Sequence, residues 1–221
     1  MAHSYSTADD FWGAQVTDIY DDFALSTTPF GSPTRVVCDT GDVVLVADDG
    51  THPALKIKVS TVILSVASKV FKTLFRSGFA EAQAIRNSPH ALVEIHIGDP
   101  PCDALLLCQI LHYQGNLENL NHQEFLSLAV IINKYDCIEA LRHVAYARFS
   151  ALQLCNYDLE EHLYYAAAAW ILDQPKFFRQ LTKDLVIYYE DSPTQNNDSH
   201  LYVLPSEVLG KYTPSVVFQP R

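Results

Sequence analysis

The chain contains little glycine and few positive charges. Its 221 residues include only eight glycines, and 15 Lys and Arg stand against 26 Asp and Glu, which gives a formal net charge of −11 at pH 7. Eight scattered glycines form no glycine-rich loop of the kind that holds a phosphate group. A chain this acidic is also poorly suited to neutralising the phosphates of DNA or RNA. We therefore expect no direct binding to nucleic acid.

The cysteines lack metal-binding spacing. Five cysteines stand at positions 38, 102, 108, 137 and 155, with no Cys-x-x-Cys pair and no histidine at zinc-finger spacing. An odd number of cysteines in a chain of this length favours buried, reduced thiols over a disulfide framework. The pattern predicts an intracellular protein, in the cytoplasm or the nucleus, without a metal site.

Long hydrophobic runs are missing as well. The longest apolar stretches, 104–108 and 126–133, fall far short of the roughly 20 residues that a membrane-spanning helix needs. The opening residues, MAHSYSTADDFWG, have neither the basic nor the apolar region of a signal peptide. We expect no signal peptide and no binding to membranes.

Patterns typical of catalysis are also missing. The chain has no Gly-x-Ser-x-Gly sequence and no His-x-x-x-His pair. Glu160, Glu161 and His162 stand together, and we interpret them as the solvated first turn of a helix, where acids suit the helix dipole. The sequence predicts no catalytic residue, no cofactor and no enzyme; a hydrolytic enzyme is the remote alternative.

The most informative stretch of the chain is 41–75. Residues 42–47 are β-branched and apolar, and Asp48-Asp49-Gly50 after them is a turn signal. Residues 55–59 then alternate between apolar side chains and lysines, as a strand with one covered face does. The pattern predicts a β-hairpin.

Two short helices are expected to follow the hairpin. Apolar residues from Val62 to Ala67 recur at helical spacing, and Ser60 is the predicted N-cap of this helix. A second helix begins at Ser68 and carries Phe71 and Phe75. Helices this short are unstable alone, so they must pack on the hairpin and on later parts of the chain.

This order of features resembles the BTB/POZ domain, over roughly residues 41–150. The matching residues of the hairpin and the two helices are Asp42, Val43, Leu45, Val59, Leu64, Ser68, Phe71, Leu74 and Phe75. The later matching residues are Glu81, the strand 93–97, and the stretches 110–115 and 134–137. The chain looks most like the stand-alone BTB proteins of fungi, since Ser60 stands where many animal members have histidine.

The resemblance implies an α+β fold, a small three-stranded sheet packed with a cluster of short helices. Asp99 with Pro100 predicts one helix start, and Asn121/Glu124 and Asp136/Glu139 predict capping boxes for the next two helices. Residues 26–40 and 77–91 are predicted to be a linker and a loop, respectively. Asp158/Glu161 and Asp173-Gln174-Pro175 begin two more helices, a C-terminal helical pair.

We predict four parts in the chain. The first is an N-terminal segment, residues 1–35, with an amphipathic helix over 9–25. A BTB/POZ-like domain follows over 36–150, then a helical extension over 151–190 and a mostly irregular tail over 191–221.

The N-terminal helix is a candidate dimer interface. Trp12, Val16, Ile19 and Phe23 follow a helical period, and aspartates occupy other sides. In the family, a helix at this place often packs across a two-fold axis, which implies a homodimer. The alternatives are a helix folded back on its own domain and a segment ordered only by a partner.

One charged pair is a further candidate. In dimeric members of the family an acid and a base lie at the floor of a groove between subunits, and the matching residues here are Asp42 and Lys58. The alternative is a capping acid and an ordinary exposed strand lysine, each contributing about 0–1 kcal/mol to stability.

The sequence thus indicates a protein–protein interaction module that self-associates and recruits protein partners, as a scaffold or a transcriptional co-regulator. The alternative is a substrate adaptor that binds a cullin in a ubiquitin ligase. No kelch, MATH or zinc-finger domain for a client protein is present, so the sequence leaves these two functions open.

Overall fold

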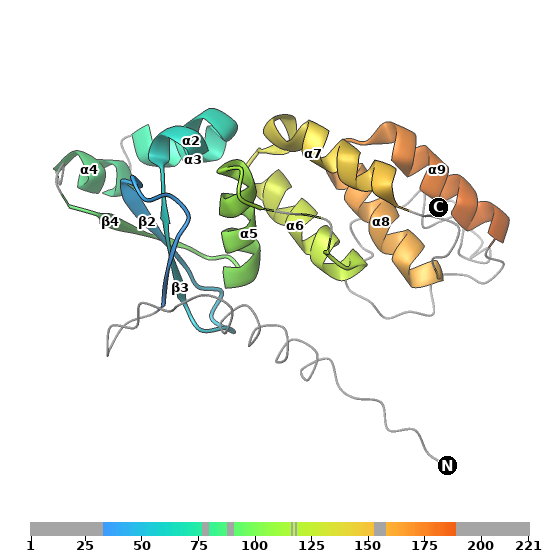
Figure 1. Cartoon of the computed structure of the whole chain (residues 1–221), viewed down its shortest axis with the longest axis horizontal. Coiled ribbons are helices and arrows are strands. Elements are labelled where there is room, and N and C mark those ends of the chain that lie inside the picture. Colours follow the sequence, from blue (N-terminus) through green and yellow to red (C-terminus); the bar gives the residue numbers. More distant parts are fainter. Residues whose placement is uncertain are drawn as a thin grey trace, which may run out of the picture.

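The structure is a computed structural model, and it describes residues 33–76, 80–87, 91–115, 117, 119–152 and 158–188. The described chain is α+β, as predicted, and combines one small sheet with a set of short helices (Figure 1). The elements in chain order are β1 (Thr34–Val36), β2 (Val43–Ala47), β3 (Leu55–Val59), α2 (Thr61–Ala67), α3 (Lys69–Arg76), α4 (Ala80–Asn87), β4 (Val93–Ile97), α5 (Pro101–Leu111), α6 (His122–Lys134), α7 (Ile138–Ala151), α8 (Leu159–Ile171) and α9 (Pro175–Tyr188).

The sheet has four strands in the order β1-β3-β2-β4. The predicted hairpin is confirmed as the antiparallel pair β2 and β3, and the predicted third strand, β4, runs parallel to β2. The expectation of three strands was wrong, because β1 lies inside the predicted linker and pairs parallel with β3. Three residues are too few to show an alternating pattern, so only the pairing with β3 reveals this strand.

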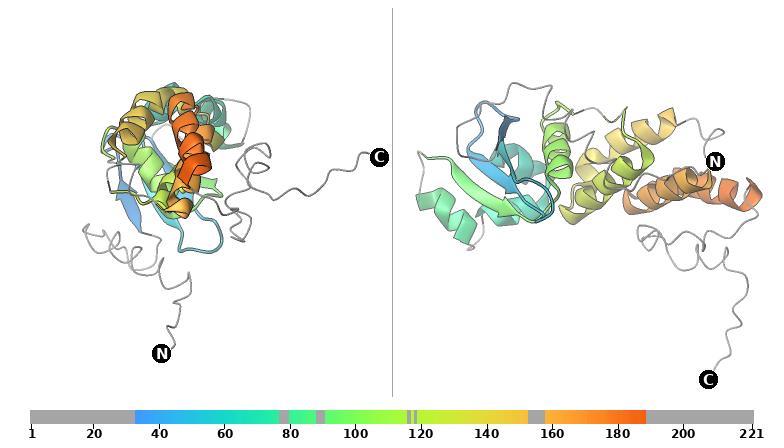
Figure 2. Two further views of the ribbon diagram at one scale, coloured as in Figure 1. Left: turned by 90° about the vertical axis from the view of Figure 1, so that its right-hand side faces the viewer. Right: turned by 90° about the horizontal axis from the view of Figure 1, so that it is seen from below.

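The two central strands differ in burial. All five side chains of β2 are buried, while β3 alternates, with Leu55, Ile57 and Val59 buried and Lys56 and Lys58 partly exposed. The core lies between the sheet and the helices, where Leu64, Phe71 and Leu107 are among the fully buried side chains. Figure 2 shows the sheet and α4 at one end of the molecule and α8 and α9 at the other.

Two of the predicted helix caps are confirmed. The Asn121 side chain accepts a hydrogen bond from the Glu124 N–H at 2.9 Å, and the Glu124 carboxylate accepts from the Asn121 N–H, also at 2.9 Å. Asp158 and Glu161 form the same reciprocal box at the start of α8. Both helices therefore begin at residues that local sequence specifies.

The predicted caps of α5 and α7 are wrong. The N-cap of α5 is Pro100, with Pro101 at the first helical position, and the N-cap of α7 is Cys137. Asp99 is buried and its carboxylate binds residues of α6 and its C-terminus, while Asp136 takes a left-handed conformation with φ of 52°. Each aspartate is used elsewhere, because the tertiary structure supplies other partners or another backbone conformation.

Helix α4 lies where a loop was predicted. Its sequence, AEAQAIRN, consists mostly of good helix formers, with Glu81 in the first turn and Arg86 in the last. Only Ala82 is buried among its side chains. The loop was predicted from the turn-forming residues at its two ends, Gly78 and Asn87-Ser88-Pro89, which bound this short helix.

The predicted C-terminal helical pair is confirmed as α8 and α9. The middle of α8, from His162 to Ala169, is buried throughout, since the helix packs between α6 and α9. Aromatic rings tie the four last helices together: Phe149 lies 5.2 Å from both Phe125 and Phe177, measured between ring centroids, and Tyr165 lies 6.1 Å from Phe125. The helical pair thus shares one core with α6 and α7, as the continuous row of helices in Figure 1 illustrates.

Candidate functional site

Helices α2 and α3 carry exposed apolar side chains. Val62 and Val66, one turn apart on α2, are 61% and 86% exposed, and Val70 on α3 is 40% exposed. Single exposed apolar residues are common on protein surfaces, whereas several on adjoining helices indicate a contact site for another polypeptide. We call Val62, Val66 and Val70 the valine surface. A shallow hollow beside it is lined by Lys69, Val70, Thr73 and Leu74.

The composition of α2 explains why valines remain uncovered. Five of the seven residues of α2, TVILSVA, are apolar, yet Leu64 is its only fully buried aliphatic side chain. A helix with apolar residues on most of its sides is normally covered on those sides. In the single chain, α2 is covered on one side and presents Val62 and Val66 on the other.

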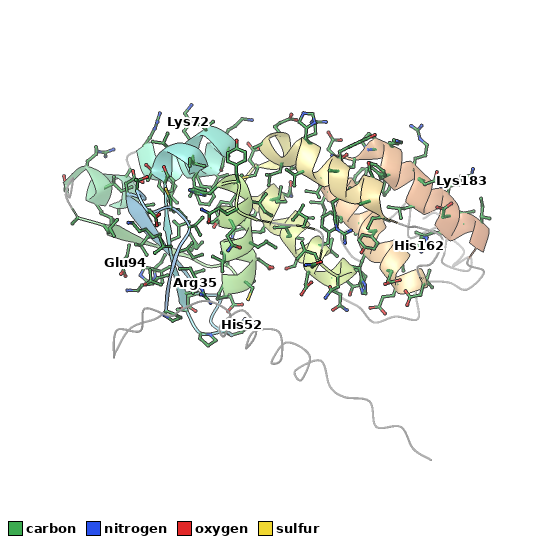
Figure 3. All side chains as sticks on the ribbon, viewed as in Figure 1. Arg35, His52, Lys72, Glu94, His162 and Lys183 are labelled. Atoms are coloured by element: carbon green, nitrogen blue, oxygen red, sulfur yellow. The ribbon has the colours of Figure 1, made fainter. Side chains whose placement is uncertain are left out.

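Positive charges flank the valine surface. Lys72 and Arg76 on α3 are exposed, and Figure 3 shows Lys72 on the outer side of α3, away from the sheet. Lys69 is 88% exposed and its Nζ lies 3.4 Å from the carboxylate of Asp136. The combination of exposed valines and lysines favours an apolar partner with acidic side chains.

Asp42, one of the two predicted groove residues, caps helix α2. Its carboxylate accepts a hydrogen bond from the Thr61 backbone N–H at 2.7 Å and another from the Thr61 hydroxyl at 2.6 Å. Ser60, the predicted N-cap, makes no side-chain capping bond, and its backbone N–H donates to His112 Nε2 at 3.1 Å. The expectation for Ser60 was wrong because the hairpin brings the carboxylate of Asp42, a stronger acceptor, to the helix end.

Lys58, the other predicted groove residue, has its own partner. Its Nζ donates to the backbone carbonyl of Asp39 at 2.6 Å. Asp42 and Lys58 project from the same face of the hairpin, since Lys58 pairs with Val44 and Asp42 precedes Val44 by two residues. Within the described chain no ion pair of up to 4 Å joins Asp42 to Lys58, and each instead holds a loop or helix end next to the sheet.

A buried polar network fixes the position of α3. Asp99, 3% exposed, accepts hydrogen bonds from the Tyr135 hydroxyl and from Lys134 Nζ, each at 2.5 Å. Ser68 accepts from the Phe71 N–H at 2.9 Å, as its predicted place at the start of α3 requires, and donates to the Tyr135 carbonyl. Burial and the bond to Asp99 raise the pKa of the Tyr135 hydroxyl, so it remains a donor. The ring of Tyr135 stacks on Phe71 with centroids 4.3 Å apart.

His112 connects the end of α5 to the start of α2. Its Nδ1 lies 2.7 Å from the Cys108 carbonyl and so carries the proton, which leaves Nε2 to accept from the Ser60 N–H. Burial lowers the pKa of His112, in keeping with a neutral ring that accepts at Nε2. The start of α2 is therefore fixed by two contacts, from Asp42 to Thr61 and from His112 to Ser60.

The chemistry of the remaining side chains is that of a packed interior. Burial raises the pKa of the Cys108 thiol to about 12 and that of Cys137 to about 11, so both thiols are protonated and unreactive. No three His, Cys, Asp or Glu side chains of the described residues gather as metal ligands. His162 is buried and its Nδ1 lies 2.9 Å from the Asp158 carbonyl, so the prediction of a solvated turn there was wrong for this histidine.

Two predicted segments lie outside the described residues: the dimer helix with Trp12, Val16, Ile19 and Phe23, and the C-terminal tail. Over the described ranges, no helix combines the length and the apolar character that crossing a bilayer requires.

The valine surface was not predicted. The available signal was the mostly apolar sequence of α2, which leaves some apolar side chains exposed when the helix is covered on one side only.

Comparison with known proteins agrees with the arrangement of sheet and helices. The family model of the BTB/POZ domain matches residues 36–148, slightly more than half of the chain. No curated protein matches the sequence. The chain belongs to the BTB/POZ family.

Proposed function

We propose that this BTB/POZ protein forms a homodimer through the valine surface and, as a dimer, recruits other proteins as a scaffold or transcriptional co-regulator. BTB domains are protein–protein interaction modules that bind protein partners and self-associate. The observation that carries the proposal is the exposure of Val62 and Val66, one turn apart on a helix in which five of seven residues are apolar. In a two-fold dimer each such surface is covered by the same elements of the partner.

We assign the second half of the interface to the N-terminal segment. Trp12, Val16, Ile19 and Phe23 provide an apolar stripe, and the segment 1–32 contains five aspartates and neither lysine nor arginine. This charge is complementary to the lysines and the arginine that flank the valine surface. In this dimer the segment packs across the two-fold axis beside the partner's valine surface, against the lysines and the arginine that flank it.

The charged residues of the hairpin fit the same proposal. Asp42 is exposed and Lys58 is partly exposed, on one face of the hairpin. We place both at the floor of a groove between the subunits, where Asp42 caps α2 and adds negative charge to the groove.

The test is the mass of the full-length protein in solution. Sedimentation equilibrium over a wide concentration range should give a dimer for the wild type and a monomer for Val62→Glu/Val66→Glu, because four glutamates would face each other across the axis. The control is Val186→Glu on α9, which is 60% exposed, like Val62 at 61%, and should remain dimeric. A monomeric wild type, or a dimeric double variant, would contradict the proposal.

A second variant tests the N-terminal segment alone. Trp12→Ala/Phe23→Ala removes its two large aromatic side chains without touching α2. We expect weaker dimerisation, seen as a shift towards monomer at low concentration. An unchanged mass would exclude the segment from the interface and leave the valine surface in place.

A cullin adaptor is the second candidate function. It requires an exposed apolar and acidic surface on the helices between Asp99 and Phe149, and Val130, Val144 and Tyr146 are 37–47% exposed there, near the exposed Glu139. A pull-down with purified cullin tests this function. Absence of binding at tens of micromolar cullin would remove it.

The thiols support an intracellular location. Four cysteines of the described chain, Cys38, Cys102, Cys108 and Cys137, are free. A reducing compartment keeps such thiols reduced. We place the protein in the cytoplasm or the nucleus.

A further inference from the structure

Helix α9 carries a row of positive charge on its outer side. Lys176, Arg179 and Lys183 are exposed and follow one another at i, i+3 and i+7, so the helical period brings them to one side. The first and the last lie about 10 Å apart along the helix axis. Together with Pro175 and Gln180 they line a hollow on this side. We call Lys176, Arg179 and Lys183 the α9 cation row; Figure 3 shows Lys183 at the end of the molecule opposite the sheet.

The α9 cation row is not neutralised by the described part of the chain. Elsewhere lysines pair with carboxylates, as Lys56 does with Glu94 at 2.5 Å. Among the described residues, no carboxylate lies within 4 Å of a charged nitrogen of the row. Asp184, the one acid in the sequence of α9, accepts hydrogen bonds from the Gln180 amide at 3.1 and 3.2 Å. Three positive charges therefore stand together on a protein with a net charge of −11.

One cation of the row is held in place by aromatic rings. Lys176 Nζ lies 5.5 Å from the ring centroid of Tyr146 and 5.3 Å from that of Phe177. It also lies 3.4 Å from the Tyr146 hydroxyl. These contacts fix the position of the ammonium group and leave its charge uncompensated.

The row continues into an apolar pair. Val186 and Ile187 are 60% and 55% exposed. Ile187 stands four residues after Lys183 and eleven after Lys176, which places it on the same side of the helix. One side of α9 thus offers positive charge followed by apolar surface.

We propose that the α9 cation row, with Val186 and Ile187, is a docking site for an acidic, amphipathic segment of another protein. Charge complementarity selects this partner. DNA, RNA or an anionic membrane extends over a large area and would be repelled by the acidic surface around the α9 cation row. A short acidic segment can contact the three cations without reaching that acidic surface. The site is separate from the valine surface and adds a second kind of partner to a self-associating protein.

The test uses the full-length protein and a fluorescein-labelled acidic peptide built from glutamate and leucine. Fluorescence anisotropy should show binding at low salt that weakens as salt is added, because exposed charges are screened. Arg179→Glu/Lys183→Glu should reduce the affinity about tenfold, because the two exposed ion pairs contribute up to about fivefold each and the new glutamates repel the acidic peptide. Lys176 is left unchanged because its side chain also packs on aromatic rings.

The control is Arg86→Glu on α4, which is matched to the single variant Arg179→Glu. Both cations are exposed, and each variant changes the net charge by the same amount, the control at the other end of the molecule (Figure 1). The control should bind the peptide with an affinity within about twofold of the wild type, because a distant, screened surface charge contributes little to binding at α9. Arg179→Met/Lys183→Met removes the charge without adding acids and should also lose binding, which covers the case in which the glutamate variant folds poorly.

Three results would overturn the proposal. The first is failure of the peptide to bind the wild type. The second is a loss of affinity in Arg86→Glu equal to that in Arg179→Glu. The third is tighter binding of a single-stranded oligonucleotide, or of phosphatidylserine-containing vesicles, with the same dependence on Arg179 and Lys183. The mass of the α9 variants is measured in parallel, so that a failure of dimerisation is distinguished from a failure of peptide binding.

Discussion

Replacing Asp42 tests whether its carboxylate stabilises helix α2 as a cap. The carboxylate accepts two short hydrogen bonds from Thr61, and no other side chain caps this helix among the described residues. Loss of an N-cap costs about 0.5–2 kcal/mol, and loss of an acid at a helix N-terminus costs about 0.3–1 kcal/mol. Both costs arise from the same exposed carboxylate, so they are not simply added. We expect Asp42→Ala to lower the free energy of unfolding by about 1–2 kcal/mol in urea titrations.

Two companion variants separate the cap from the groove pair. Asp42→Asn keeps one acceptor for the Thr61 N–H and should lose about half as much stability, on the scale of a neutral cap. A double-mutant cycle with Thr61→Ala should give a coupling energy of about 0.5–1 kcal/mol, since these side chains touch. The same cycle with Lys58→Met should be additive within about 0.5 kcal/mol, because Lys58 binds the Asp39 carbonyl instead.

The control for these measurements is Asp39→Ala. Asp39 is an exposed aspartate of the same loop, and it is its backbone carbonyl that contacts Lys58. If Asp42→Ala is no more destabilising than this control, the capping role is refuted. A coupling of Asp42 to Lys58 that exceeds its coupling to Thr61 would show that the two charges act directly on each other and not through their separate partners.

The remaining predictions concern buried polar groups. Tyr135→Phe keeps the stack on Phe71 and removes one donor from the buried Asp99, so the free energy of unfolding in urea should fall by about 1.5–3 kcal/mol; an unchanged midpoint would show that Lys134 suffices. His112 has a lowered pKa in the folded protein, so its neutral form stabilises the fold. This contribution to the free energy of unfolding is complete above the unfolded pKa near 6.5. It is lost as the pH falls from that value towards the folded pKa. Thermal unfolding of wild type and His112→Gln between pH 8 and about pH 5 should show a steeper acid loss in the wild type; parallel curves would refute the assignment.

Some features of this protein follow from residues close together in sequence. The capping boxes at Asn121 and Asp158 and the alternation over 55–59 all have the predicted form, because donor and acceptor, or inner and outer face, are set by spacing within one element. The resemblance to the BTB/POZ family rests on such local features in a fixed order. These features therefore predict the α+β fold without information on contacts between elements.

Other features depended on partners from distant parts of the chain. Ser60 has the side chain of a helix cap, yet Asp42, eighteen residues earlier, takes that role because the hairpin brings it to the helix. Asp99, followed by Pro100, also has the local sequence of a helix start, yet Tyr135 and Lys134 bind its carboxylate. A side chain with several available donors binds the ones that folding brings near, and sequence spacing does not reveal them.

The sequence by itself determined the type and order of most elements, since hydrophobic period, turn residues and local caps act within a few residues. Only the tertiary structure decided which of the apolar and charged sides remain open. The sequence of α2 shows that it is mostly apolar, and the sequence of α9 shows three cations. Neither sequence shows which other elements pack against these side chains. The exposure of Val62, Val66 and the α9 cation row follows from the positions of the neighbouring helices, because burial is a property of the packed chain.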